Sequence, residues 1–188
     1  MSASKPRPGF PARLPAGAPA PAPARAKPTV QPALSATSGL GLDSHAVRQA
    51  MVRKLSGQGI THAEVLQAMG TVERHRFVDS ALVNQAYEDT SLPIGLGQTI
   101  SKPNVVARML ELLREGQSGR LGRVLEIGTG CGYQAAVLSV LATEVYSIER
   151  LRGLHDKARE NLRPFRLPNL HLLLGDGMLG YAKGAPYA

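Results

Sequence analysis

A short apolar run that leads into three glycines at every second position constrains this fold more than any other feature of the sequence. Residues 124–136 read Val-Leu-Glu-Ile-Gly-Thr-Gly-Cys-Gly-Tyr-Gln-Ala-Ala, which is typical of a buried strand, a glycine turn and the start of a helix. Side chains in place of Gly128, Gly130 and Gly132 would obstruct positive φ angles and keep a ligand away from the N–H groups at the helix start. The run therefore predicts a nucleotide-type ligand held against bare backbone.

Strand and helix patterns alternate after this loop. Strands are predicted at 123–127, 144–148 and 170–174, and the segments between them, 133–141 and 151–162, have helical spacing. This order predicts an α/β fold class, with the first three strands of a partial doubly wound Rossmann-like sheet. Right-handed crossovers would place the strand at 123–127 innermost and the strand at 170–174 at the outer edge.

The part before the sheet is predicted to be helical. Helical spacing covers 44–55, and Thr61 with Glu64 has the form of a capping box that opens a second helix as far as about residue 72. The stretch 87–103 has no sustained periodicity and is predicted to be a structured loop, the kind of segment in which function tends to lie. A third helix is expected over 103–113, with Ser101 at or just before its N-cap, so Ser101 has either a capping or a functional role.

Composition divides the chain near residue 42. Residues 1–42 are rich in Pro and Ala, and the first forty hold five of the 22 Lys and Arg residues and none of the 14 acids, so residues 41–188 carry 17 basic against 14 acidic residues, net +3. We expect a disordered basic tail at 1–42 and one domain at 43–188. The absence of a secretory signal, of a membrane-length apolar run and of more than one cysteine favours a soluble cytoplasmic protein. No metal site is expected.

Three acids follow or precede the loop where a ligand would lie. Glu126 stands two residues before Gly128, Glu149 follows it by 21 residues, and Asp176 ends the last predicted strand. An acid about 20 residues past the glycines accepts hydrogen bonds from ribose hydroxyls in this class of fold. The Gly-x-Gly-x-Gly spacing and the carboxylate of Glu126 disfavour a dinucleotide, and they suit S-adenosylmethionine, which has an adenosine, a sulfonium and an ammonium but no phosphate.

Each acid also has a simpler interpretation from the sequence alone. Glu149 could be a solvated residue at a strand end, Asp176 could belong to a Gly-Asp-Gly turn, and Glu126 could be paired with a nearby arginine. Cys131 is expected to be a small residue packed beneath the loop, because no His or acid is placed in the sequence to activate it.

With these residues in view, the chain from about residue 44 to 187 resembles the protein-L-isoaspartate O-methyltransferases. The resemblance is carried by Val72-Glu73-Arg74-His75-Arg76-Phe77-Val78, by the run from Tyr87 to Pro103 with its Gly-Gln-Thr-Ile-Ser-x-Pro motif, by Leu125 to Gly132, and by Gly175-Asp176-Gly177 with Ala185-Pro186-Tyr187. It implies methyl transfer from S-adenosylmethionine to the free carboxylate of L-isoaspartyl residues in damaged proteins, which is a protein repair reaction.

The resemblance also implies roles for individual residues. Ser101 would be the active-site serine, in a loop that meets both donor and substrate. The residues implied to bind the donor are Thr99, Ile100, Glu126, Gly128, Thr129, Gly130, Gly132, Glu149, Asp176 and Gly177, with Asp176 near the adenine. Those implied to contact the substrate are Pro93, Ile94 and Gln98.

The sequence departs from the family's pattern after Tyr187, where that pattern continues with an Asp, a fourth strand and further elements. We therefore expect a C-terminally truncated methyltransferase domain in which Val124, Leu125 and Ile127 line an open sheet edge, with poor solubility or weak donor binding. A complete enzyme of this kind is expected to be a monomer. The main alternative is a catalytically silent donor-binding fragment or interaction module; an RNA methyltransferase and an NAD-linked oxidoreductase are disfavoured by the lack of a basic aromatic cluster and by the glycine spacing.

Overall fold

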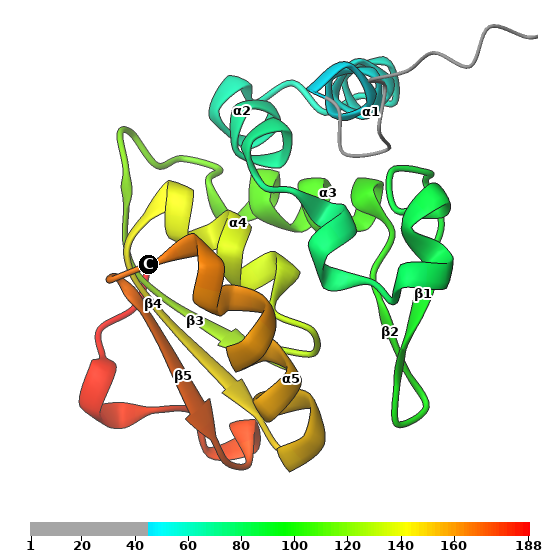
Figure 1. Ribbon diagram of the computed structural model, residues 1–188. Helices are drawn as coiled ribbons and strands as arrows, with labels where there is room; N and C mark the ends of the chain where they lie inside the picture. The colour runs from blue at the N-terminus through cyan, green and yellow to red at the C-terminus, as the bar shows by residue number, and fades with distance from the viewer. Residues whose placement is uncertain (1–44) are drawn as a thin grey trace, which may run out of the picture. The chain divides into compact units, whose positions relative to one another are not determined.

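Three parallel strands form the central sheet of the computed structural model, which describes residues 45–188 (Figure 1). β3 (Leu121–Ile127), β4 (Ala142–Glu149) and β5 (Leu170–Leu174) are hydrogen-bonded in the order β3-β4-β5. The predicted α/β class is confirmed, and β5 lies at an outer edge as expected. The predictions for residues 1–42 and for the domain boundary at 43 lie outside the described residues.

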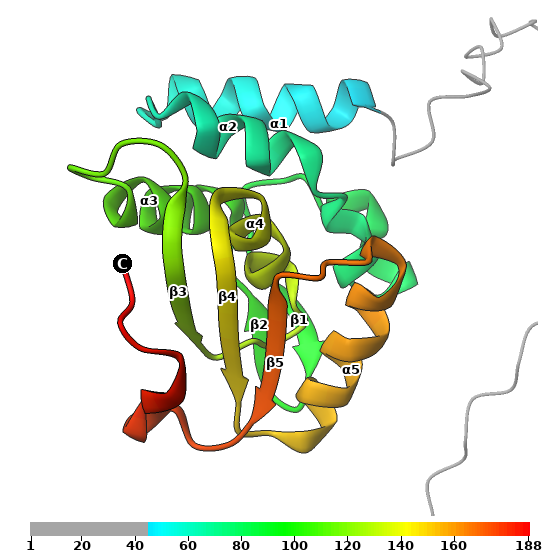
Figure 2. The same ribbon diagram turned by 90° about the vertical axis from the view of Figure 1, so that its left-hand side faces the viewer.

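Two helices cover one face of this sheet, and the last residues of the chain cover the other (Figure 2). α4 (Tyr133–Leu141) and α5 (Arg152–Leu162) are the crossovers, and right-handed connections in one direction place both on the same face. α4 is apolar almost all round, because it is enclosed between the sheet and the N-terminal helices. On the opposite face the ring of Tyr146 lies 5.3 Å from that of Tyr181 and 6.1 Å from that of Tyr187.

The N-terminal helices pack on one another and, through α2, on α4. They are α1 (His45–Gly57), α2 (Ala63–Thr71) and α3 (Pro103–Leu113), with short 3₁₀ turns at η1 (Arg74–Phe77) and η2 (Ser80–Gln85) between α2 and the hairpin. Three further 3₁₀ turns follow in the second half of the chain, η3 (Arg163–Phe165), η4 (Gly177–Leu179) and η5 (Ala182–Gly184).

The predicted capping box at the start of α2 is wrong. The N-cap is His62, without a side-chain capping bond. The N–H groups of Thr61 and His62 donate instead to Oε1 of Glu111 on α3, over 2.7 and 3.0 Å, and the Thr61 hydroxyl donates to the same oxygen over 3.0 Å. A carboxylate that accepts three hydrogen bonds from a neighbouring helix satisfies the orphan donors better than a local side chain would.

The segment predicted to be a structured loop contains an antiparallel hairpin. β1 (Leu92–Gly95) pairs with β2 (Gln98–Ile100), so that Leu92 faces Ile100 across the pair. The strands have only four and three residues, and Pro93 and Gly95 interrupt the alternation, so that the period of two could not be recognised in the sequence. The buried side chains of Leu92, Ile94 and Ile100 attach this hairpin to the core.

β3 lies at the edge of the described sheet opposite β5, as the sequence predicted. On the side of β3 that faces away from β4, the backbone forms one hydrogen bond with another described segment, in which the N–H of Ala188 donates to the carbonyl of Arg123 over 2.8 Å. The side chain of Ile127 is 56% exposed, whereas that of Val124 is buried, because it points into the core beneath the sheet. Within residues 45–188, no helix has the length and apolar character needed to cross a bilayer.

Candidate active site

The glycine loop between β3 and α4 has the backbone conformation that the sequence predicted. Gly128, Gly130 and Gly132 have φ values of +91°, +58° and +92°, a region that side chains disfavour. The N–H of Gly128 donates to the carbonyl of Ile148 on β4 over 2.8 Å, which fixes the loop to the carboxyl end of the sheet. Gly132 is the N-cap of α4, and a Cβ there would lie 2.8 Å from Cδ1 of Leu162. Three glycines are therefore required for the turn itself.

Glu149 ties this loop to the start of α5. Its Oε2 accepts a hydrogen bond from the N–H of Gly130 over 2.9 Å, and its Oε1 accepts one from the N–H of Leu151 over 2.9 Å. Only 5% of the residue is exposed, so the simpler interpretation of a solvated strand end is wrong. Each carboxylate oxygen retains a second lone pair with which it can accept a hydrogen bond from a ligand hydroxyl.

Glu126 lies beneath the loop and is 4% exposed. The parallel register places it beside Ser147 of β4, whose hydroxyl donates to its Oε2, and the hydroxyl of Thr129 lies 2.6 Å from that of Ser147. Burial is the main reason why the pKa of Glu126 is raised to about 8, partly offset by hydrogen bonds from Ser147 and Gln134. Among the described residues no arginine forms a salt bridge with Glu126, so the arginine-paired interpretation is wrong.

Two adjoining cavities lie at the carboxyl ends of the strands. The larger, about 640 Å³, is lined by Thr99, Gln98 and Ile94 of the hairpin, by Gly128 and Gly130, and by Glu149, Asp176 and Gly177. The smaller, about 160 Å³, is lined by Ile100, Ser101, Glu126 and Thr129. Ile94, Thr99, Ile127, Gly128 and Gly130 border both cavities. A ligand with two chemically different ends would therefore be held across one continuous crevice.

Ser101 lies between β2 and α3, at the exposed side of the smaller cavity. The N-cap of α3 is Lys102, which makes no side-chain capping bond, and Pro103 occupies the first helical position as predicted. Ser101 thus lies just before the N-cap, one of the two positions predicted, and the capping role considered from the sequence is wrong. Its position on the wall of the cavity makes the hydroxyl available to a ligand.

Asp176 and Gly177 close the larger cavity from the end of β5. The carboxylate of Asp176 accepts a hydrogen bond from the N–H of Met178 over 3.0 Å, so it does serve the turn that the simpler interpretation predicted. The same exposed side chain also borders the cavity. Gly177 packs directly on the side chain of Ile127, where a Cβ would overlap it.

Two of the predicted residues lie outside both cavities. Gly132 is packed against Leu162, and Pro93 is exposed on the hairpin. Conversely, Leu151 and Leu154 line the larger cavity and Tyr133 and Gln134 the smaller one, although none was predicted. The available signal was that Tyr133 and Gln134 follow Gly132 directly and that Leu151 and Leu154 lie within a few residues after Glu149. Cys131 is buried beneath the loop as predicted, and burial raises the pKa of its thiol.

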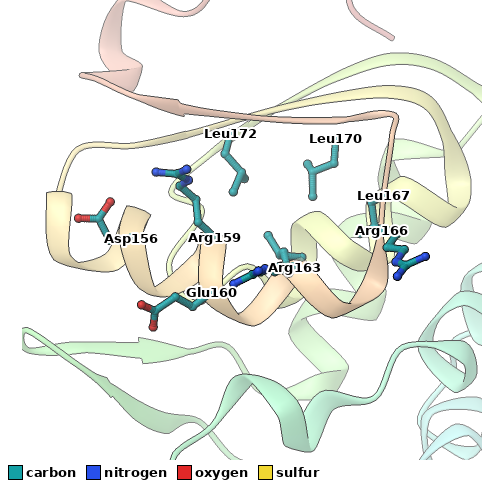
Figure 3. Close-up of a pocket in the computed structure, with 9 residues that line it drawn as sticks. Asp156, Arg159, Glu160, Arg163, Arg166, Leu167, Leu170 and Leu172 are labelled. Atoms are coloured by element: carbon teal, nitrogen blue, oxygen red, sulfur yellow. The ribbon is translucent and has the colours of Figure 1, made fainter.

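Another cavity, larger than these two at about 770 Å³, is elsewhere (Figure 3). It lies between α5, η3 and β5, where Leu167, Leu170 and Leu172 line it together with charged residues of α5 and of the segment that follows. Asp156 and Glu160 stand among Arg159, Arg163 and Arg166, so charges of both signs line it. None of the predicted site residues borders this cavity, and no glycine lines it. The chemistry is therefore assigned to the crevice at the strand ends.

Known proteins are similar to this chain over most of its length. A family model described as Protein-L-isoaspartate(D-aspartate) O-methyltransferase matches residues 46–188. A protein-L-isoaspartate O-methyltransferase of Methylibium petroleiphilum is 57% identical in an alignment that covers 100% of this chain and 74% of the relative. One of Leptothrix cholodnii is 62% identical over 85% of this chain and 56% of its own length. The chain thus spans between 56% and 74% of the length of these relatives.

Solved structures give the same result at lower identity. A protein-L-isoaspartate O-methyltransferase structure superposes with a TM-score of 0.66 and 28% identity, and the match covers 74% of this chain and 45% of that one. A Plasmodium falciparum structure in complex with S-adenosyl-L-homocysteine has a TM-score of 0.58 at 21% identity, with coverages of 68% and 62%, and shows the likeness of the fold.

Proposed function

The chain belongs to the protein-L-isoaspartate(D-aspartate) O-methyltransferase family, and we propose that it transfers a methyl group from S-adenosylmethionine to the free carboxylate of L-isoaspartyl residues in damaged proteins. One observation supports this more than any other. The smaller cavity is lined by Ser101 and by Glu126 with the glycine loop, and it adjoins the larger cavity, with which it shares lining residues. A substrate carboxylate beside Ser101 would therefore meet a donor that extends along the strand ends.

The residues of the crevice suit this donor. Glu149 offers a lone pair on each oxygen to ribose hydroxyls, and Asp176 stands at the far end of the larger cavity. Glu126 lies beneath the glycine loop, and because burial keeps its carboxyl neutral in the donor-free protein, an ammonium group beside it would favour its ionised form whereas a phosphate would oppose that ionisation. When bound, S-adenosylmethionine supplies an electrophilic methyl group, which passes to a carboxylate oxygen as its bond to sulfur breaks and the sulfonium becomes a neutral thioether.

The contribution of the chain's own residues is alignment and exclusion of water. The α-carboxylate of an isoaspartyl residue is already ionised at neutral pH, so no general base is required. The Ser101 hydroxyl donates a hydrogen bond that aims one carboxylate oxygen, while the apolar side chains of Ile94, Val106 and Met109 line the same cavity and exclude water. Orientation of this kind is worth up to about 7–11 kcal/mol.

The proposal is tested by methyl transfer to a matched pair of peptides. The full chain, S-adenosylmethionine and an isoaspartyl peptide should yield a base-labile methyl ester, and the same peptide with a normal aspartyl residue should not. Donor affinity is measured in parallel by calorimetry. Donor binding without transfer to the isoaspartyl peptide would refute the proposed activity and leave a catalytically silent donor-binding module.

Ser101→Ala separates alignment from donor binding. A hydrogen bond to a charged group contributes about 1.5–3 kcal/mol, so turnover should fall by about 10- to 150-fold while the donor's dissociation constant stays within about twofold. Thr90→Ala, a hydroxyl deletion at a residue that borders neither cavity, is the control. A large loss of donor affinity with normal turnover at saturating donor would contradict the role given to Ser101.

The setting of this activity is part of the same proposal. We propose a cytoplasmic enzyme that acts on proteins and peptides as a monomer, without a specific nucleic acid or membrane partner. Residues 41–188 have a net charge of only +3, which supports the absence of a nucleic-acid surface in this part. Sedimentation at several protein concentrations tests the monomeric state, and sedimentation with added RNA tests the absence of a nucleic-acid partner.

A further inference from the structure

Arg74 is the most deeply buried charged residue that the proposed mechanism does not use. It lies in η1, is 0% exposed, and belongs to the run 72–78 that carried part of the family resemblance without a role of its own. Within residues 45–188 no carboxylate forms a salt bridge with it. Desolvation lowers the pKa of Arg74, and an unpaired buried cation is costly to maintain. Such a residue needs a reason beyond filling the core.

The contacts of Arg74 converge on the active site. Its Nε donates to the carbonyl of Ala86 over 2.8 Å, and its Nη2 donates to the carbonyl of Ser101 over 2.7 Å. Its guanidinium carbon lies 4.7 Å from the centroid of the Tyr133 ring. Tyr133 is the first residue of α4 and follows Gly132 directly. One planar group therefore joins the backbone of the serine to the helix that begins at the glycine loop.

From these contacts we infer that Arg74 is a positioning residue, which fixes the backbone of Ser101 relative to the glycine loop and so sets the distance between the serine and the methyl donor. The inference rests on the proposed function. Ser101 lies outside both β2 and α3, so its carbonyl depends on an external donor. The rigid fork of an arginine can serve two carbonyls at once and present a face to an aromatic ring, which a lysine cannot do.

Arg114 provides a matched control. It is also buried, at 3% exposure, and its Nη2 donates to the carbonyl of Gly119 over 2.6 Å. It is the C-cap of α3, at the opposite end of that helix from Ser101, and it borders neither cavity. Its Nε also donates to Nε2 of His62 and its Nη2 lies 4.0 Å from Oε1 of Glu64, so Arg114→Lys removes a buried fork that donates to no carbonyl beside the serine. The comparison therefore separates a positioning effect from a general loss of stability.

The test uses the full chain with Arg74→Lys, and with Arg74→Gln in case the lysine variant does not fold. Turnover on the isoaspartyl peptide should fall about 10- to 100-fold in the Arg74 variants, since a displacement of about 1 Å can cost that much, while donor affinity changes less than threefold. Amide hydrogen exchange at residues 99–102 should rise. Arg114→Lys should lower the melting temperature by a similar amount but leave turnover and exchange at 99–102 unchanged.

Two results would overturn the inference. One is a parallel loss of donor affinity and turnover in Arg74→Lys, which would place its effect on the glycine loop. The other is exchange at 99–102 that matches the wild type in both Arg74 variants. If the wild-type chain does not methylate the isoaspartyl peptide, the proposed function fails, but the exchange measurement still decides whether Arg74 holds the serine backbone.

Discussion

Glu126→Gln should stabilise the donor-free protein, and the gain should grow with pH. The carboxyl group is 4% exposed, and burial raises its pKa from 4.5 to about 8. Between these values the unfolded chain has lost the proton while the folded chain keeps it. The folded state then binds more protons than the unfolded state, so its stability falls as pH rises, by about 1.4 kcal/mol per pH unit.

The expected magnitude at pH 7 follows from the two pKa values. Ionisation of the unfolded chain between pH 4.5 and 7 favours unfolding by about 3 kcal/mol, because little of the folded form ionises in that range. Glutamine has nearly the same shape, does not titrate, and keeps an acceptor oxygen for the hydroxyl of Ser147. The free energies of unfolding of the variant and the wild type should therefore differ at pH 4.5 only by a constant offset. At pH 7 the variant should be more stable than the wild type by about 3 kcal/mol in addition to that offset.

The assay is urea unfolding of wild type and Glu126→Gln at pH 5, 6.5 and 8, without donor. Only the difference between the two proteins is interpreted, because all other titratable groups are common to both. Glu160→Gln, which changes an exposed glutamate on α5, should show no pH-dependent difference from the wild type. If the difference between wild type and Glu126→Gln is the same at all three pH values, the buried neutral carboxyl is refuted.

Two further predictions concern the loop. Glu149→Ala should weaken donor binding by about 10- to 100-fold, as expected for a lost charged hydrogen-bond acceptor, with turnover at saturating donor nearly unchanged. Calorimetry and single-turnover rates measure the two quantities. An unaltered donor affinity would show that Glu149 is not part of the donor site. Gly132→Ala should destabilise the fold by about 1–3 kcal/mol, because φ of Gly132 is +92° and the new Cβ would meet the side chain of Leu162. A melting temperature equal to that of the wild type would show that the turn tolerates a side chain.

The sheet and its crossovers were predictable because burial made their patterns long and regular. β3, β4 and β5 are runs of five to eight residues, and β4 begins only two residues before its predicted start. The strand order followed from the handedness of crossovers, which depends on chirality and not on side-chain detail. Once the order was known, the carboxyl ends of the strands could be assigned to one edge, and with them Glu149 and Asp176.

The elements that the sequence did not predict are those whose cause is distant in the chain. The hairpin of β1 and β2 is too short for its alternation to be recognised, and its buried residues are determined by the core that it covers. The start of α2 is capped by Glu111, 50 residues further along the chain, where the local pattern proposed Thr61. Arg74 was part of a recognised motif, but its contact with Ser101 exists only in the folded chain.

Contacts between distant residues also explain why the sequence indicated Glu126 as a site residue but not its protonation state. Glu126 alternates with apolar neighbours along β3, and alternation says only that it faces away from Leu125 and Ile127. The parallel register then sets its partner: Ser147 on β4 lies beside it, and Thr129 completes a chain of hydroxyls. Burial keeps the carboxyl neutral because the hydrogen bond from Ser147 lowers its pKa only in part, where an arginine beside it would have favoured the ionised form. The protonation state of Glu126 therefore depends in part on strand pairing. A one-residue slip of β4 would replace Ser147 by a residue of the opposite face of the sheet.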